Sequence, residues 1–66
     1  MVLDLFSKAE LIKKEGDFED YLVSVKDKYF SVITLSYEYI EPEVSYQTDW
    51  FNTKEQAIQA YENDLQ

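Results

Sequence analysis

Apolar and polar residues alternate along residues 21–25 and again along residues 44–51, and this two-residue period constrains the fold more than any other feature. Successive side chains of a β-strand point to opposite faces, so such alternation predicts strands with one buried face. Residues 29–39, which lie between these stretches, are rich in aromatic and β-branched residues, as strands are. The sequence therefore predicts three strands.

Two short connections define the register of this predicted sheet. Lys26-Asp27-Lys28 forms the first turn, and Pro42-Glu43 forms the second, where proline is at a favoured position. If residues 25 and 29 flank the first turn and residues 41 and 44 flank the second, six cross-strand pairs follow. They are Tyr21–Ile33, Leu22–Val32, Val23–Ser31, Leu35–Trp50, Tyr37–Thr48 and Tyr39–Tyr46.

This register predicts an antiparallel meander with one apolar, buried face and one polar, open face. The predicted core face holds Tyr21, Val23, Val25, Tyr29, Ile33, Leu35, Tyr37, Val44, Tyr46 and Trp50. The predicted polar face holds Ser24, Lys26, Thr34, Ser36, Glu38, Ser45, Gln47 and Asp49.

A helix is predicted on each side of the three strands. Ser7 and Glu10 fit a capping box and Gly16 fits a left-handed helix stop, which predicts a helix over residues 8–15, with an alternative start at Leu3. Thr53 and Gln56 form a second capping box. It precedes an apolar stripe at helical spacing, made of Ala57, Ile58, Tyr61 and Leu65. The predicted fold is one α+β domain over residues 1–66, in the order α-β-β-β-α.

The composition excludes several classes of function. The 66 residues contain 14 acids and 6 lysines, a net charge of −8, which opposes direct binding to nucleic acid through phosphates. The chain has no Cys and no His, so disulfides, nucleophilic triads and most transition-metal sites are not expected. No run of residues approaches the length of a membrane span. We therefore expect a cytoplasmic, non-enzymatic protein without metal or cofactor.

The negative charge is concentrated in the second half of the chain. Residues 1–28 hold seven acids and five lysines, a balance of −2, whereas residues 29–66 hold seven acids and one lysine, a balance of −6. These seven acids are candidate partner-binding residues that imitate phosphates toward a basic groove on another protein. The alternative is a solvated face that maintains solubility. The seven are Glu38, Glu41, Glu43, Asp49, Glu55, Glu62 and Asp64.

Three apolar residues fall on the predicted polar face. Leu22 and Val32 pair across the first hairpin and Phe30 lies diagonal to them, so they form a candidate contact surface for a homodimer. The alternative for these residues is that the first helix covers them. The alternative function for the protein is a small structural or interaction module that forms a homodimer through the sheet, by this surface or along a free strand edge, without imitating phosphates.

Residues 50–61, WFNTKEQAIQAY, resemble the junction between strand and helix in AP2 domains and in the arm-binding domains of phage integrases. The resemblance implies a three-stranded sheet with one helix, in which the open sheet face docks on DNA through Arg, Lys and Trp. The matching face here offers one cation, Lys26, against the acids Glu38 and Asp49. The DNA-binding function is therefore not carried over.

In overall character the chain is similar to small acidic proteins that phages and mobile elements express against host machinery. This similarity is one of composition, since the chain is short, acidic and rich in tyrosine. It implies an inhibitor of the anti-CRISPR or anti-restriction type, a DNA mimic that acts in the host cytoplasm on a nucleic-acid-binding protein.

Overall fold

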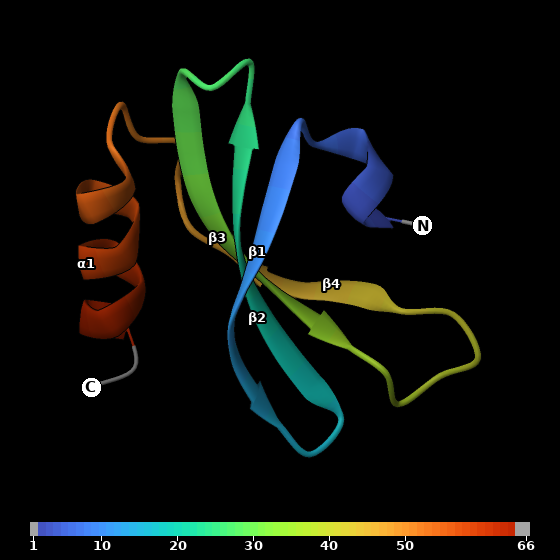
Figure 1. Ribbon diagram of the computed structural model, residues 1–66. Helices are drawn as coiled ribbons and strands as arrows, with labels where there is room; N and C mark the ends of the chain where they lie inside the picture. Colours follow the sequence, from blue (N-terminus) through green and yellow to red (C-terminus); the bar gives the residue numbers. More distant parts are fainter. Residues whose placement is uncertain (1, 65–66) are drawn as a thin grey trace.

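A computed structural model describes residues 2–64, which form a four-stranded antiparallel sheet and one α-helix (Figure 1). The strands lie side by side in chain order, β1-β2-β3-β4. The predicted α+β class is confirmed, but the sheet has four strands instead of three. The elements are the 3-10 helix η1 (Val2–Leu5), β1 (Lys8–Glu15), β2 (Phe18–Val25), β3 (Tyr29–Ser36), β4 (Glu43–Gln47) and α1 (Lys54–Asp64).

The helix predicted over residues 8–15 is wrong, because this segment is strand β1. It pairs with β2 from Lys8 opposite Ser24 to Glu15 opposite Phe18. Gly16 has the left-handed conformation that the sequence indicated, with a φ of 59°, but it forms the tight turn to β2 instead of ending a helix. The hydroxyl of Ser7 accepts a hydrogen bond from the N–H of Lys26 at 2.8 Å. The predicted cap therefore joins the start of β1 to the end of β2, which lie at the same end of the sheet.

The hairpin of β2 and β3 has the predicted register. Val25 lies opposite Tyr29, and Leu22 lies opposite Val32. Lys26 and Asp27 in the connection have positive φ values of 55° and 52°. The local turn residues therefore define this pairing correctly.

The register predicted for the second hairpin is wrong. Leu35 lies opposite Val44 and not opposite Trp50, so β3 ends at Ser36 and residues 37–42 form a loop. The N–H of Tyr37 still donates a hydrogen bond to the carbonyl of Asp17, at 2.7 Å, which continues the β2–β3 pairing by one residue beyond Phe18 and Ser36. The pairing of β3 with β4 has an irregularity between Thr34 and Leu35, which no local turn residue indicates.

After β4 the chain continues beside β3 through Thr48. Its hydroxyl accepts the N–H of Val32 at 2.9 Å, and its own N–H donates to the carbonyl of Val32 at 3.0 Å. Phe30 and Phe51 then form an isolated antiparallel bridge. These contacts bring the chain to the point from which α1 crosses the sheet.

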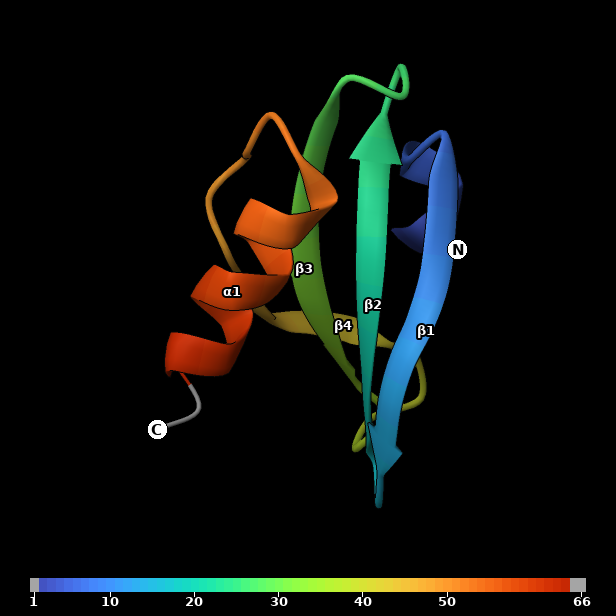
Figure 2. The ribbon, with the colours of Figure 1, turned by 60° about the vertical axis from the view of Figure 1, so that its left-hand side comes forward.

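Both faces of the sheet are buried, which corrects the expectation of one buried face. Helix α1 packs on the face predicted to be open (Figure 2), where Leu22 and Val32 form a core with Ala57 and Tyr61. Phe30 packs against this core and is partly buried. The predicted contact surface of Leu22, Phe30 and Val32 is therefore covered, by the C-terminal helix and not by an N-terminal one.

The opposite face holds the second core. Val23, Ile33 and Leu35 are completely buried, and Leu3 and Phe6 from the η1 region pack against them. Three residues predicted for this core, Tyr29, Val44 and Trp50, are exposed. A fourth, Tyr46, lies opposite Thr34 and packs against the core on the α1 side.

The sequence-predicted stripe of the last helix is largely confirmed. Ala57 and Tyr61 are buried and Ile58 packs against them, while Leu65 lies outside the described residues. The hydroxyl of Thr53 accepts the N–H of Gln56 at 3.2 Å, so the predicted cap is present. No helix within residues 2–64 has the length and apolar character of a membrane span.

Candidate functional site

The structure divides six of the seven predicted acids into two groups, and the seventh, Asp49, lies between β4 and α1. Glu38, Glu41 and Glu43 lie on the loop between β3 and β4 or at its end, whereas Glu55, Glu62 and Asp64 lie on α1. The loop and α1 occupy opposite sides of the molecule in both views (Figures 1 and 2). The seven residues therefore do not form one continuous row of carboxylates.

The loop of residues 37–42 presents apolar side chains together with acids. Ile40 is fully exposed, at 103% of its reference area, and Tyr39 is 65% exposed. Glu38 and Glu41 flank this pair, and Glu43 follows at the start of β4. We call these five residues, Glu38, Tyr39, Ile40, Glu41 and Glu43, the acidic loop surface. It has a formal charge of −3 and contains no lysine.

The base of this loop is anchored, although its tip is exposed. The ring of Tyr37 packs against the core of Val23, Ile33 and Leu35. The hydroxyl of Tyr37 is hydrogen-bonded to Glu19, which raises the pKa of Tyr37 to about 12 and lowers the pKa of Glu19. A fixed base limits the conformational freedom that the tip loses when it binds a partner.

Two of the three acids on α1, Asp64 and Glu55, have a partner or a position that accounts for them within the fold. Asp64 accepts a hydrogen bond from the hydroxyl of Tyr46, and this bond together with burial raises the pKa of Tyr46 to about 12. Glu55 lies in the first turn of the helix, where its negative charge interacts favourably with the positive end of the helix dipole. Asp49 is exposed between β4 and α1, and its charge also acts on Tyr46.

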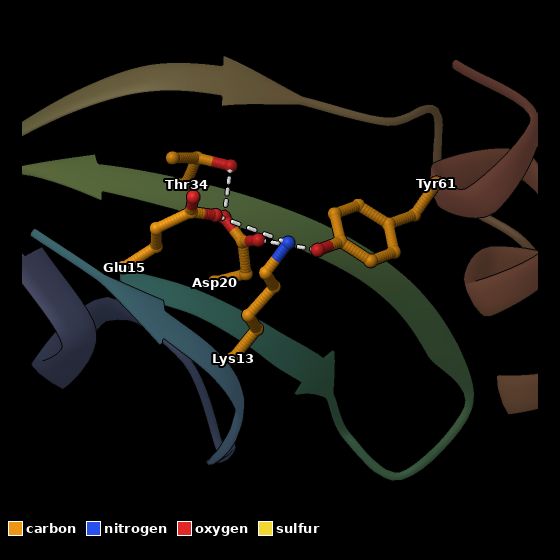
Figure 3. Close-up of polar contacts among 5 residues, drawn as sticks. All are labelled: Lys13, Glu15, Asp20, Thr34 and Tyr61. Atoms are coloured by element: carbon orange, nitrogen blue, oxygen red, sulfur yellow. Dashed lines mark hydrogen bonds and ion pairs between the residues drawn. The ribbon is translucent and has the colours of Figure 1, made fainter. Parts of the chain in front are cut away.

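A second polar cluster, which the sequence analysis missed, lies between α1 and the sheet (Figure 3). Asp20 accepts hydrogen bonds from the hydroxyl of Tyr61 and from the hydroxyl of Thr34, the latter at 2.6 Å. Burial and the bond to Asp20 raise the pKa of Tyr61 to about 12. Lys13 and Glu15 both lie on β1, the strand next to β2, and form a separate ion pair with a distance of 3.1 Å.

This cluster is suited to holding α1 on the sheet. Its tyrosine hydroxyl is a weaker acid than an exposed one, which favours a permanent hydrogen bond over proton transfer near neutral pH. The signal in the sequence was the pairing of Asp20 with Thr34 in the first hairpin, which placed a carboxylate beside a hydroxyl on the helix face. Tyr61 itself was predicted only as an apolar contact.

Within residues 2–64, no group of three or more Asp or Glu side chains is arranged to hold a metal ion. Comparison with known proteins found no family model, no curated protein and no solved structure that matches this chain. The candidate site therefore depends on its own geometry, and that geometry favours the acidic loop surface.

Proposed function

We propose that the protein is a non-enzymatic binding module whose acidic loop surface engages a basic site on another protein. One observation supports this proposal above the others. A fully exposed isoleucine and a mostly exposed tyrosine stand at the tip of an anchored loop, surrounded by three glutamates. Such a group exposes apolar area to water at no evident benefit to the fold.

The composition of the loop resembles the centre of a protein interface. An apolar or aromatic side chain that enters a pocket on the partner contributes much of the binding energy, and polar residues around it exclude water. Tyr39 and Ile40 correspond to the inserted group, and Glu38, Glu41 and Glu43 correspond to the rim. A single exposed apolar side chain is ordinary on a protein surface, but an adjacent pair on a projecting loop is typical of a contact site.

The charge of the loop indicates the chemistry of the partner. No lysine occurs between Tyr29 and Thr53, so the −3 charge of the acidic loop surface is not neutralised by cations from neighbouring positions in the chain. A cationic groove with an apolar pocket is the complementary surface. Attraction between unlike charges also accelerates encounter, and salt screens it.

In its narrower form, the proposal takes the basic groove to be the nucleic-acid-binding site of a host protein. Three carboxylates then stand in for phosphates, and the protein acts as an inhibitor of the anti-CRISPR or anti-restriction type. The net charge of −8 and the near absence of lysine in the second half of the chain support this form. The acids on α1 lie on another side of the molecule, and the narrower form of the proposal does not require them.

The proposal is tested by affinity capture from a bacterial lysate with two pairs of matched variants. The double charge reversal E41K/E43K has its control in E55K/E62K, which changes the net charge equally on α1. The apolar variant Ile40→Ser has its control in Leu5→Ser, which alters another exposed apolar residue, 79% exposed. Captured proteins are identified by mass at low and high salt.

We expect the wild-type protein and both controls to capture the same partner, and both loop variants to lose it. Binding energy concentrated in a few side chains predicts at least a tenfold weakening for each loop variant, roughly 1.4 kcal/mol. A partner that both loop variants retain would contradict the proposal, and so would a wild-type protein that captures nothing. A DNA oligonucleotide that fails to compete would contradict the narrower form alone.

A further inference from the structure

Strand β1 is a free edge of the sheet. It pairs with β2 on one side, and among residues 2–64 no strand lies on its other side. All eight of its residues are exposed, including Leu11 at 51% and Ile12 at 38%. An edge of this length leaves backbone N–H and C=O groups available to another strand.

The charge of β1 differs from that of the rest of the chain. Residues 8–15 hold three lysines and two glutamates, a balance of +1, in a protein with a net charge of −8. Two copies of such an acidic protein repel one another over most of their surfaces. Contact through β1 keeps the acidic second half of each chain out of the interface, so it limits this repulsion.

A bulge in β1 decides which of its charges share a face. Leu11 lies opposite Tyr21 and Lys13 lies opposite Asp20, so Ile12 is the extra residue. On either side of the bulge, Lys8, Glu10, Lys13 and Glu15 all lie opposite even-numbered residues of β2, which are on the α1 side of the sheet. Ala9 and Lys14 lie opposite Val23 and Glu19, on the other side.

This arrangement makes β1 complementary to itself in one antiparallel register. When Leu11 lies opposite Ile12 of a second copy, Glu10 lies opposite Lys13 and Lys8 lies opposite Glu15. Each of these pairs has its side chains on the same face of the joined sheet, as cross-strand contact requires. All four charge pairs across the two-fold axis are then of opposite sign.

The neighbouring registers are disfavoured, either because paired side chains lie on different faces or because like charges lie opposite each other. A shift by one residue places Glu10 opposite Lys14, or Ala9 opposite Lys13, and these side chains lie on different faces of the sheet. A shift by two residues places Lys8 opposite Lys13, or Glu10 opposite Glu15, where like charges repel. The bulge and the charge pattern together select a single register.

We propose that two copies of the chain associate through their β1 strands in this register and form a continuous eight-stranded antiparallel sheet. The ion pairs that Lys8 and Lys13 make within one chain, with Asp27 and Glu15, are highly exposed and do not hold these lysines strongly. Edge strand β4 is a poorer candidate, since it has five residues and its only charged residue is Glu43.

Charge reversal at the two central positions tests the proposal. In Glu10→Lys the introduced lysine of each copy faces Lys13 of the other, and in Lys13→Glu the introduced glutamate faces Glu10. Two copies of either single variant therefore repel each other at two symmetry-related positions. An equimolar mixture of the two variants restores opposite charges at both positions, and so does the double variant E10K/K13E. Sedimentation equilibrium over a range of protein concentrations measures the association.

We expect the wild type, the mixture and the double variant to dimerise, and each single variant to associate at least about tenfold more weakly. Glu55→Lys and Lys54→Glu, with the same charge changes on α1, are expected to dimerise like the wild type. A wild type that remains monomeric at high concentration would overturn the proposal, as would single variants that dimerise like it while retaining a wild-type circular dichroism spectrum. None of these substitutions touches the acidic loop surface, so this test and the capture experiment fail independently.

Discussion

The two faces of the sheet are both buried, but they are covered in different ways. On one face, the eleven residues of α1 cover Leu22 and Val32. On the other face, Leu3 of η1, Phe6 directly after it and the ring of Tyr37 help to cover Ile33 and its neighbours, which are completely buried. A short and irregular cover therefore protects its core at least as well as a regular helix does.

The two covers nevertheless share one kind of polar contact. Each cover includes a tyrosine hydroxyl that is hydrogen-bonded to a carboxylate of β2, Tyr61 to Asp20 on the α1 side and Tyr37 to Glu19 on the other. A tyrosine can bury its ring and still satisfy its hydroxyl at the margin of the core. A hydrogen bond from a tyrosine hydroxyl to a carboxylate of β2 therefore helps to hold each of two unrelated covers in place.

The largest expected effect comes from truncation inside the completely buried core. We expect Ile33→Ala to reduce the free energy of unfolding by about 2–5 kcal/mol, because it removes buried methyl groups and leaves a cavity. Leu22→Ala on the α1 side, where the side chain is 7% exposed, is expected to lie toward the lower end of this range. Urea unfolding measures both. A larger loss for Leu22→Ala than for Ile33→Ala would reverse the proposed ranking of the two covers.

Removal of a single hydroxyl has a smaller effect on the α1 side. We expect Tyr61→Phe to reduce the free energy of unfolding by about 1 kcal/mol, since Asp20 loses one of two donors. Tyr46→Phe is its matched control. It removes the bond to Asp64, which is exposed, so its effect is smaller. Equal unfolding midpoints for Tyr61→Phe and the wild type would show that ring packing alone holds α1.

Both faces also share a dependence of stability on alkaline pH. Hydrogen bonds and burial raise the pKa of Tyr37, Tyr46 and Tyr61 from 10 to about 12. Their contribution to stability is therefore complete below pH 10, the value for the unfolded chain, and is lost as the pH rises toward 12. Burial and Glu19 also raise the pKa of Tyr21, so ultraviolet titration of tyrosinate is expected to show four of the six tyrosines ionising late. A single ionisation step near the ordinary tyrosine pKa in the folded protein would contradict the proposed bonds.

The parts of the fold that the sequence predicted correctly carry local signals. The first hairpin has a three-residue turn between two strongly patterned strands, and α1 has a cap at Thr53 that precedes its apolar stripe. Strand β1 was not predictable in the same way. Its capping residues fit a helix, and only pairing with β2 across the Gly16 turn favours a strand.

The same reasoning explains the outcome at the candidate site. The exposed acids of the loop followed from composition, but Tyr39 was expected inside the sheet and Ile40 was not singled out. Both were missed because β3 pairs with β4 in another register, with Ser36 opposite Glu43 and an irregularity between Thr34 and Leu35, so that residues 37–42 form a loop instead of a strand. The signal that was available is an apolar pair enclosed by glutamates directly before a proline.

The order of the strands has a consequence for how the protein is made. Every strand pairs with its neighbour in the chain, so the sheet can assemble from hairpins of low contact order while synthesis proceeds. Helix α1 follows all four strands, and Leu22 and Val32 lack their cover until it emerges from the ribosome. During that interval the nascent chain presents an apolar sheet face that chaperones recognise, and arrest of synthesis before residue 54 would prolong the exposure.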